Sequence, residues 1–95
     1  MPEKKPLEWS VRSRRNLTAI YDHIAPENHA AALAVLTEIR ETGLKLSNFP
    51  MLGHSGRRSG TRELVLLRYP YTLVYRVYAA RLVIVAVLHQ SRKYA

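Results

Sequence analysis

The sequence predicts a two-layer α+β domain in which an antiparallel helical hairpin covers one face of a β-sheet. Two observations predict this class: apolar residues recur at helical spacing up to Pro50, and past Gly53 the pattern changes to the alternation typical of strands. A short segment before the helices adds an N-terminal strand. The chain has 95 residues, 47% hydrophobic and 23% charged, which is the size and composition of one globular domain over residues 1–95.

The first strand and the first helix are predicted from residues 7–26. Leu7–Trp9 reads as a strand at an edge of the sheet, where the missing N–H of Pro6 costs nothing. Ser10 is a suitable N-cap for the helix, and Pro26 ends it. Its apolar residues, spaced three or four positions apart, are Leu17, Ile20, Tyr21 and Ile24.

A second, longer helix follows after a connection of two or three residues. Asn28 can cap it and Pro50 stops it. Gly43 costs about 1 kcal/mol inside a helix, so we expect the helix to fray towards that end. The short connection predicts an antiparallel hairpin whose apolar stripe faces the sheet. That stripe consists of Ala32, Val35, Leu36, Ile39 and Leu46.

Three strands are predicted in the second half. The side chains of residues 61–69 alternate between two faces, and in the middle of the segment both faces are mostly apolar. This pattern is typical of a central strand. Pro70 marks a turn into a strand over residues 71–78. A tight connection over 79–81 then leads to a strand over 82–89. The three strands should pair as an antiparallel meander, so the predicted sheet has four strands in all.

The net charge of +8 is concentrated in the second half of the chain. Residues 1–48 carry seven basic and six acidic side chains, whereas residues 49–95 carry eight basic side chains against Glu63 alone. Such a positive field attracts nucleic acid or an acidic protein surface, and salt weakens the attraction. Five of the six tyrosines share this half, where they offer faces for stacking. These residues could instead have structural roles: the basic side chains could cover the solvent-facing side of the sheet, and tyrosine is a residue that favours strands.

Several classes of protein are disfavoured by composition. The chain has no cysteine, so disulfides, thiolate nucleophiles and cysteine-based zinc sites are excluded. Its longest apolar run, residues 82–88, is too short to span a bilayer, so we expect a cytoplasmic protein. His23, His29 and His54 lack partners at metal-site spacing, and we expect no metal and no cofactor. The glycines and arginines of residues 54–60 indicate a mobile basic loop that contacts a partner.

Four segments of the sequence stand in a distinctive order. They are residues 46–53 (LSNFPMLG), 60–64 (GTREL), 69–77 (YPYTLVYRV) and 87–92 (VLHQSR). Together with the order of elements, they resemble the RelE/ParE superfamily of bacterial type II toxins over nearly the whole chain. Arg14 and Asn16 depart from residues that many members carry in the first helix. These two are expected at surface or helix-packing positions.

The resemblance implies a small basic toxin that a cognate acidic antitoxin wraps and neutralises, which makes a hetero-oligomer. It also implies one of two activities. RelE-like members cut messenger RNA in the ribosomal A site, whereas ParE-like members inhibit DNA gyrase and have no demonstrated catalytic site. Fold alone does not separate the two activities.

The ribonuclease activity would need a proton acceptor, cations at the phosphate and a proton donor. His89 could serve as base or acid, Arg62 and Arg92 as phosphate clamps, and Tyr94 as donor or stacking platform. Arg62 matches the arginine of RelE-like members, but the segment from residue 88 to Arg92 is the pattern of ParE-like ones. Each candidate has a structural alternative: His89 could cap its strand, and Arg62 could bond a carboxylate or a carbonyl.

The sequence is therefore compatible with three functions. The favoured one is a ParE-like gyrase inhibitor, the second is a RelE-like ribosome-dependent ribonuclease, and the third is a basic nucleic-acid-binding module without toxicity. An arginine-ringed apolar groove along the sheet or the hairpin should hold an antitoxin helix or strand. The arginines expected to bind partners are Arg57, Arg58, Arg62, Arg68, Arg76 and Arg92.

Overall fold

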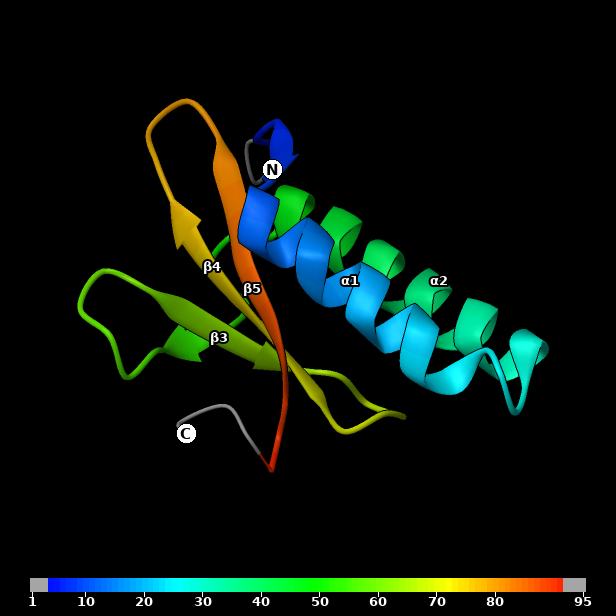
Figure 1. The fold of residues 1–95 in the computed structure, drawn as a ribbon. Coiled ribbons are helices and arrows are strands. Elements are labelled where there is room, and N and C mark those ends of the chain that lie inside the picture. Colours follow the sequence, from blue (N-terminus) through cyan, green and yellow to red (C-terminus); the bar gives the residue numbers. More distant parts are fainter. Residues whose placement is uncertain (1–3, 92–95) are drawn as a thin grey trace.

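A computed structural model describes residues 4–91 and confirms the two-layer α+β architecture (Figure 1). The helices α1 and α2 lie side by side against one side of a twisted sheet. The elements in chain order are β1 (Leu7–Trp9), α1 (Val11–Ile24), α2 (His29–Asn48), β2 (His54–Ser55), β3 (Arg62–Val65), β4 (Tyr71–Val77) and β5 (Leu82–His89).

Within residues 4–91, the sheet has five strands in the order β1-β5-β4-β3-β2, one more than predicted. The additional strand is β2, which lies in the segment expected to be a loop and pairs antiparallel with β3. The predicted meander of β3, β4 and β5 is confirmed, and β1 lies at an edge as expected. Because β1 runs parallel to β5, the sheet is mixed.

Both helices begin at the predicted caps. The hydroxyl of Ser10 accepts the N–H of Ser13 at 3.0 Å, and the side chain of Asn28 accepts the N–H of Ala31 at 2.9 Å. These bonds satisfy N–H groups that have no partner within the first turn of a helix. The first helix ends at Ile24, before Pro26.

The predicted fraying of α2 near Gly43 is wrong, because the helix continues to Asn48. Gly43 is buried, and a Cβ atom there would lie 2.9 Å from the ring of Trp9. The glycine lets the indole ring of β1 approach the helix closely, and this packing outweighs the low helix propensity of glycine.

The strand expected over residues 61–69 is shorter than predicted, although it has a neighbouring strand on both sides. β3 covers only Arg62–Val65 and lies between β4 and the two-residue β2. Leu66 donates its N–H to the carbonyl of Tyr71, which closes the turn into β4. The central strands are β4 and β5, whose residues Leu73, Tyr75, Leu82 and Ile84 are fully buried.

Helix α1 is bonded directly to β5 where β1 no longer covers that strand. β1 pairs only with residues 82–84 of β5. Beyond them, the hydroxyl of Ser10 donates to the carbonyl of Val85 at 2.8 Å, and the Asn16 side chain accepts the N–H of Val87 at 2.9 Å. Polar side chains of the helix therefore satisfy backbone groups that a neighbouring strand would otherwise bond.

Candidate functional site

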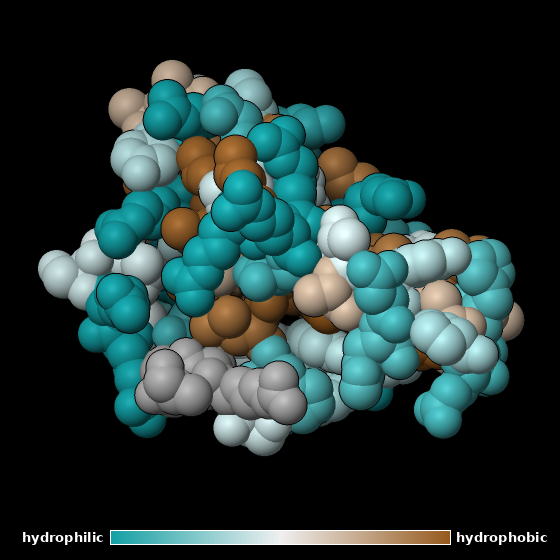
Figure 2. Space-filling view, viewed as in Figure 1, coloured by the Kyte–Doolittle hydropathy of each residue, from teal (hydrophilic) through white to brown (hydrophobic). Residues whose placement is uncertain are grey.

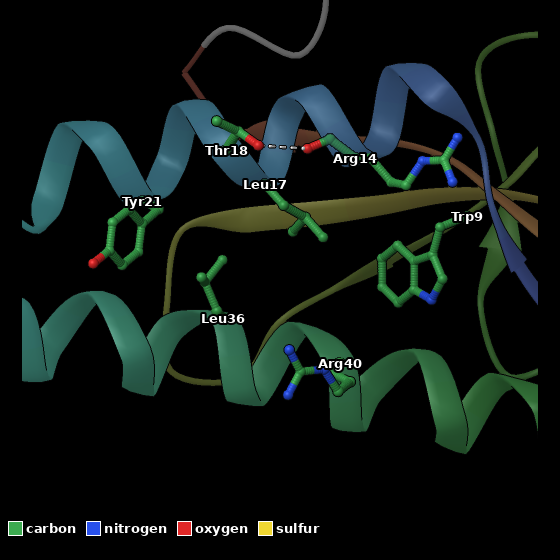
Figure 3. Close-up of a pocket in the computed structure, with 7 residues that line it drawn as sticks. All are labelled: Trp9, Arg14, Leu17, Thr18, Tyr21, Leu36 and Arg40. Carbon is green, nitrogen blue, oxygen red and sulfur yellow. Dashed lines mark hydrogen bonds between the residues drawn. The ribbon is translucent and has the colours of Figure 1, made fainter.

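An apolar groove lies between the two helices and has a volume of about 570 Å³ (Figure 3). Leu17 and Tyr21 extend from α1, and Leu36 extends from α2 into the same space. Trp9 lies at one end of the groove, with Arg14 of α1 and Arg40 of α2 on either side. Among residues 4–91, no acidic side chain lines it. The groove thus offers apolar surface beside two guanidinium groups, which fits an amphipathic segment with acidic residues.

The sequence predicts an apolar groove ringed by arginines, but Arg14 and Arg40 are not among the arginines expected to bind partners. Arg14, Leu17 and Tyr21 stand three and four residues apart, so they share one face of α1. This spacing is the signal that identifies Arg14. Arg40 follows Leu36 by four residues on α2, which places it on the groove side in the same way.

Arg62 is directed into the protein rather than towards a ligand. Its Nη2 atom donates to the carbonyl of Met51 at 3.1 Å and also to the carbonyl of Gly53. Beside it, the buried hydroxyl of Tyr75 donates to the carbonyl of Pro50 at 2.8 Å and accepts the N–H of Gly53 at 2.9 Å. These two bonds are of the kind that the structural alternative for Arg62 expects. Arg62 and Tyr75 together hold the segment that follows α2.

Arg57, Arg58 and Arg76 gather at the loop between β2 and β3. The guanidinium of Arg76 donates to the carbonyl of Ser59 at 3.2 Å, and the backbone N–H of Arg57 donates to the buried carboxylate of Glu63 at 3.3 Å. Further bonds from Gly56 to Thr61 and from Thr61 to Arg58 close this loop. The segment expected to be a mobile loop is therefore a hydrogen-bonded hairpin.

Arg68 lies at the other end of β3, in the turn towards β4. Its Nε atom is 3.9 Å from a carboxylate oxygen of Glu38 on α2, and its side chain is 82% exposed. An ion pair this exposed contributes little stability. Arg68 therefore lies apart from Arg57, Arg58 and Arg76, and Arg62 is engaged internally. Figure 2 likewise shows hydrophilic side chains over both the strands and the helices on the face drawn.

His89 is exposed at the end of β5. Its Nδ1 atom lies 2.8 Å from the hydroxyl of Ser91 and 3.2 Å from the N–H of the same residue. Its ring meets the ring of Tyr71 edge to face, with the centroids 5.3 Å apart. Arg92 and Tyr94, the other two residues predicted for cleavage, lie outside the described residues.

The structure does not bring Arg62 and His89 together. Their partners on β4 are Tyr75 and Tyr71 respectively, so both side chains emerge on the same face of the sheet. Those partners stand four residues apart, about 13 Å along the strand, and β4 separates β3 from β5 by two spacings of about 5 Å. Groups so far apart do not converge on one phosphate.

The sheet face opposite Tyr75 is mostly apolar. The register places Val65, Thr72 and Leu88 in one row across this face, and Glu63, Val74 and Ala86 in the next. Over β3, β4 and β5, this face carries no histidine or tyrosine that could transfer a proton. Residues 4–91 also contain no cluster of three metal-ligating side chains.

Comparison with known proteins gives consistent matches over nearly the whole chain. Residues 7–94 match the family described as ParE toxin of the type II toxin-antitoxin system parDE. A Sinorhizobium fredii protein named "Putative toxin Y4kP" is 32% identical over 91 residues, which cover 96% of this chain and 94% of that protein.

Solved structures share the fold. A structure of the chromosomal ParDE system from P. aeruginosa matches with a TM-score of 0.83 and 26% identity, over 90% of this chain and 96% of that one. The RelBE2 toxin-antitoxin complex from Mycobacterium tuberculosis gives a TM-score of 0.62 and 26% identity, over 92% and 99%. The E. coli DinJ-YafQ complex, at 10% identity and a TM-score of 0.67 over 98% and 100%, shows likeness of fold alone.

Proposed function

The chain belongs to the ParE toxin family of type II toxin-antitoxin systems, and on this premise we propose that it arrests growth by inhibiting DNA gyrase in the cytoplasm. Among residues 4–91, neither helix is both long and apolar enough to cross a membrane. The family match favours the two toxin functions over a nucleic-acid-binding module without toxicity. The choice between the two toxin functions depends on where the candidate catalytic residues lie.

The position of Arg62 is the observation that supports gyrase inhibition over RNA cleavage. A RelE-like ribonuclease would use this arginine at the scissile phosphate, but here its guanidinium bonds the carbonyls of Met51 and Gly53. His89 lies at the opposite end of the sheet face. Cleavage requires these groups to converge, whereas protein binding does not.

The experiment compares plasmid topology and message integrity in the same cells after induction of the toxin. Gyrase inhibition should relax plasmids in the cells and block supercoiling by purified gyrase, while messenger RNA stays intact. Messages cut within ribosomes, with plasmids still supercoiled, would identify the ribonuclease instead. Unaffected growth would contradict both toxin functions.

A cognate acidic antitoxin is proposed to neutralise the toxin by occupying the groove between α1 and α2. The structural relatives from P. aeruginosa and M. tuberculosis are toxin-antitoxin systems, which supports an antitoxin partner here. The groove presents Leu17, Tyr21 and Leu36 together with two arginines. An amphipathic helix that carries acidic side chains would bury the apolar residues and pair with the cations.

A further inference from the structure

The turn that ends α2 exposes three large apolar side chains in four consecutive positions. We call residues 49–52 the apolar turn. The exposed fractions are 52% for Phe49, 65% for Met51 and 48% for Leu52. Single apolar residues on a surface are ordinary, but a contiguous exposed group marks an interaction site.

The backbone of the apolar turn is held from two sides. The Tyr75 hydroxyl bonds the carbonyl of Pro50 and the N–H of Gly53, while Arg62 bonds the carbonyls of Met51 and Gly53. A Cβ atom at Gly53 would come within 2.6 Å of the Glu63 carbonyl and of the Tyr75 hydroxyl. These bonds fix the backbone of the turn before a partner binds. Such preorganisation lowers the entropic cost of association.

The sequence on both sides of the apolar turn is basic. Residues 45–62 include Lys45, Arg57 and Arg58, all exposed, and contain no acidic residue. The next acidic residue, Glu63, is only 3% exposed. The turn leads directly into β2, whose two residues connect it to the hairpin that carries Arg57 and Arg58. A complementary partner is a protein with an apolar pocket bordered by carboxylates.

We propose that the apolar turn inserts into such a pocket on the protein that the toxin inhibits. Under the proposed function, on which this inference rests, that protein is DNA gyrase. The turn shares no residue with the groove between the helices, whose lining comes from β1, α1 and residues 36 and 40 of α2. The toxin would then have one surface for its target and another for its antitoxin.

The test is the double variant Met51→Ser with Leu52→Ser. Both side chains are exposed, and the hydrogen bonds from Arg62 and Tyr75 act on the backbone, so we expect the fold to be retained. Affinity for purified gyrase holoenzyme should fall about tenfold or more, because buried apolar anchors dominate interface energetics. Growth arrest should weaken in parallel, while antitoxin binding stays unchanged. The matched control is Leu33→Ser with Leu67→Ser, which replaces two other exposed leucines, 47% and 93% exposed.

Each outcome decides the proposal. Wild-type gyrase affinity and growth arrest in the double variant would overturn it, as would an equal loss in the control or a parallel loss of antitoxin binding. If the wild-type toxin does not bind gyrase, the proposed function is wrong. Growth arrest by the double variant and by the control is then the measurement that tests the role of the apolar turn. Arrest that is lost in the double variant, kept in the control and accompanied by intact antitoxin binding supports the turn with another target protein. Arrest that persists overturns it.

Discussion

The guanidinium of Arg62 stabilises the segment that follows α2 through the carbonyls of Met51 and Gly53. The Nε atom of the same side chain is buried and has no bonding partner within the described part of the chain. Hydrogen bonds from a charged donor contribute more than neutral ones, and a buried acceptor left without its donor carries a desolvation cost. Arg62 is therefore a structural residue in this fold.

At the residue scale, replacing Arg62 with alanine should lower the free energy of unfolding by about 2 kcal/mol. Urea denaturation followed by circular dichroism measures this change. Arg58→Ala is the matched control, because that side chain is exposed in the neighbouring hairpin, and it should alter stability by less than about 0.5 kcal/mol. Equal stability of the Arg62 variant and the wild type would show that the bonds to the loop contribute nothing.

The sequence predicts which side chains of β3 share a face of the sheet, but it does not predict the hydrogen-bond partners of Arg62. Its partners precede it by 9 and 11 residues and are backbone carbonyls, which have no signature in the sequence. The same is true of Tyr75, whose hydroxyl bonds a carbonyl 25 residues earlier. The motif over residues 46–53 indicated a family, whereas its physical role became visible only with these contacts.

At the scale of elements, Asn16 connects α1 to β5 by accepting the N–H of Val87 at 2.9 Å. Asn16→Ala removes the acceptor and should lower the free energy of unfolding by about 1–3 kcal/mol, because the N–H of a buried strand residue loses its partner. Asn16→Asp keeps an oxygen at this position and should retain most of the stability. Thermal unfolding of the two variants measures the difference, and equal losses would contradict a role for the acceptor.

The helices were predicted more fully than the strands, and the reasons differ by element. Ser10, Asn28 and the prolines are local signals, so both helix starts and the end of α1 could be predicted. The course of α2 past Gly43 depends on Trp9, which is distant in sequence. The lengths of β2 and β3 also depend on distant contacts: β2 exists through its pairing with β3, and the apolar pattern past Val65 belongs to a turn whose Leu66 is buried.

On the scale of the whole molecule, the basic residues serve several surfaces. Arg14 and Arg40 flank the groove, Arg57, Arg58 and Arg76 gather at a hairpin, and Arg68 faces Glu38. The composition shows an excess of basic residues. It does not show which of them share a surface, because that depends on how the chain folds. The arginines of the groove come from the half of the chain whose charges nearly balance.

Antitoxin binding should depend on both the charge and the apolar surface of the groove. Arg14→Glu with Arg40→Glu should weaken the complex by about tenfold or more at low salt, and the wild-type affinity should fall as ionic strength rises. Titration calorimetry at several salt concentrations measures both effects. The control, Arg12→Glu with Arg58→Glu, makes the same change in net charge outside the groove. A similar loss in the control, or a complex insensitive to salt, would contradict this location.

The pairing of β1 with β5 has a consequence for the timing of folding. β1 contains residues 7–9, and its parallel partner begins at residue 82, so the pairing joins residues that are far apart in the sequence. β5 also supplies the surface on which α1 packs. A ribosome must reach residue 89 before β5 is complete, and long-range pairing forms slowly. The sheet of the folded toxin, and any surface that depends on it, can therefore form only after residue 89 has been synthesised.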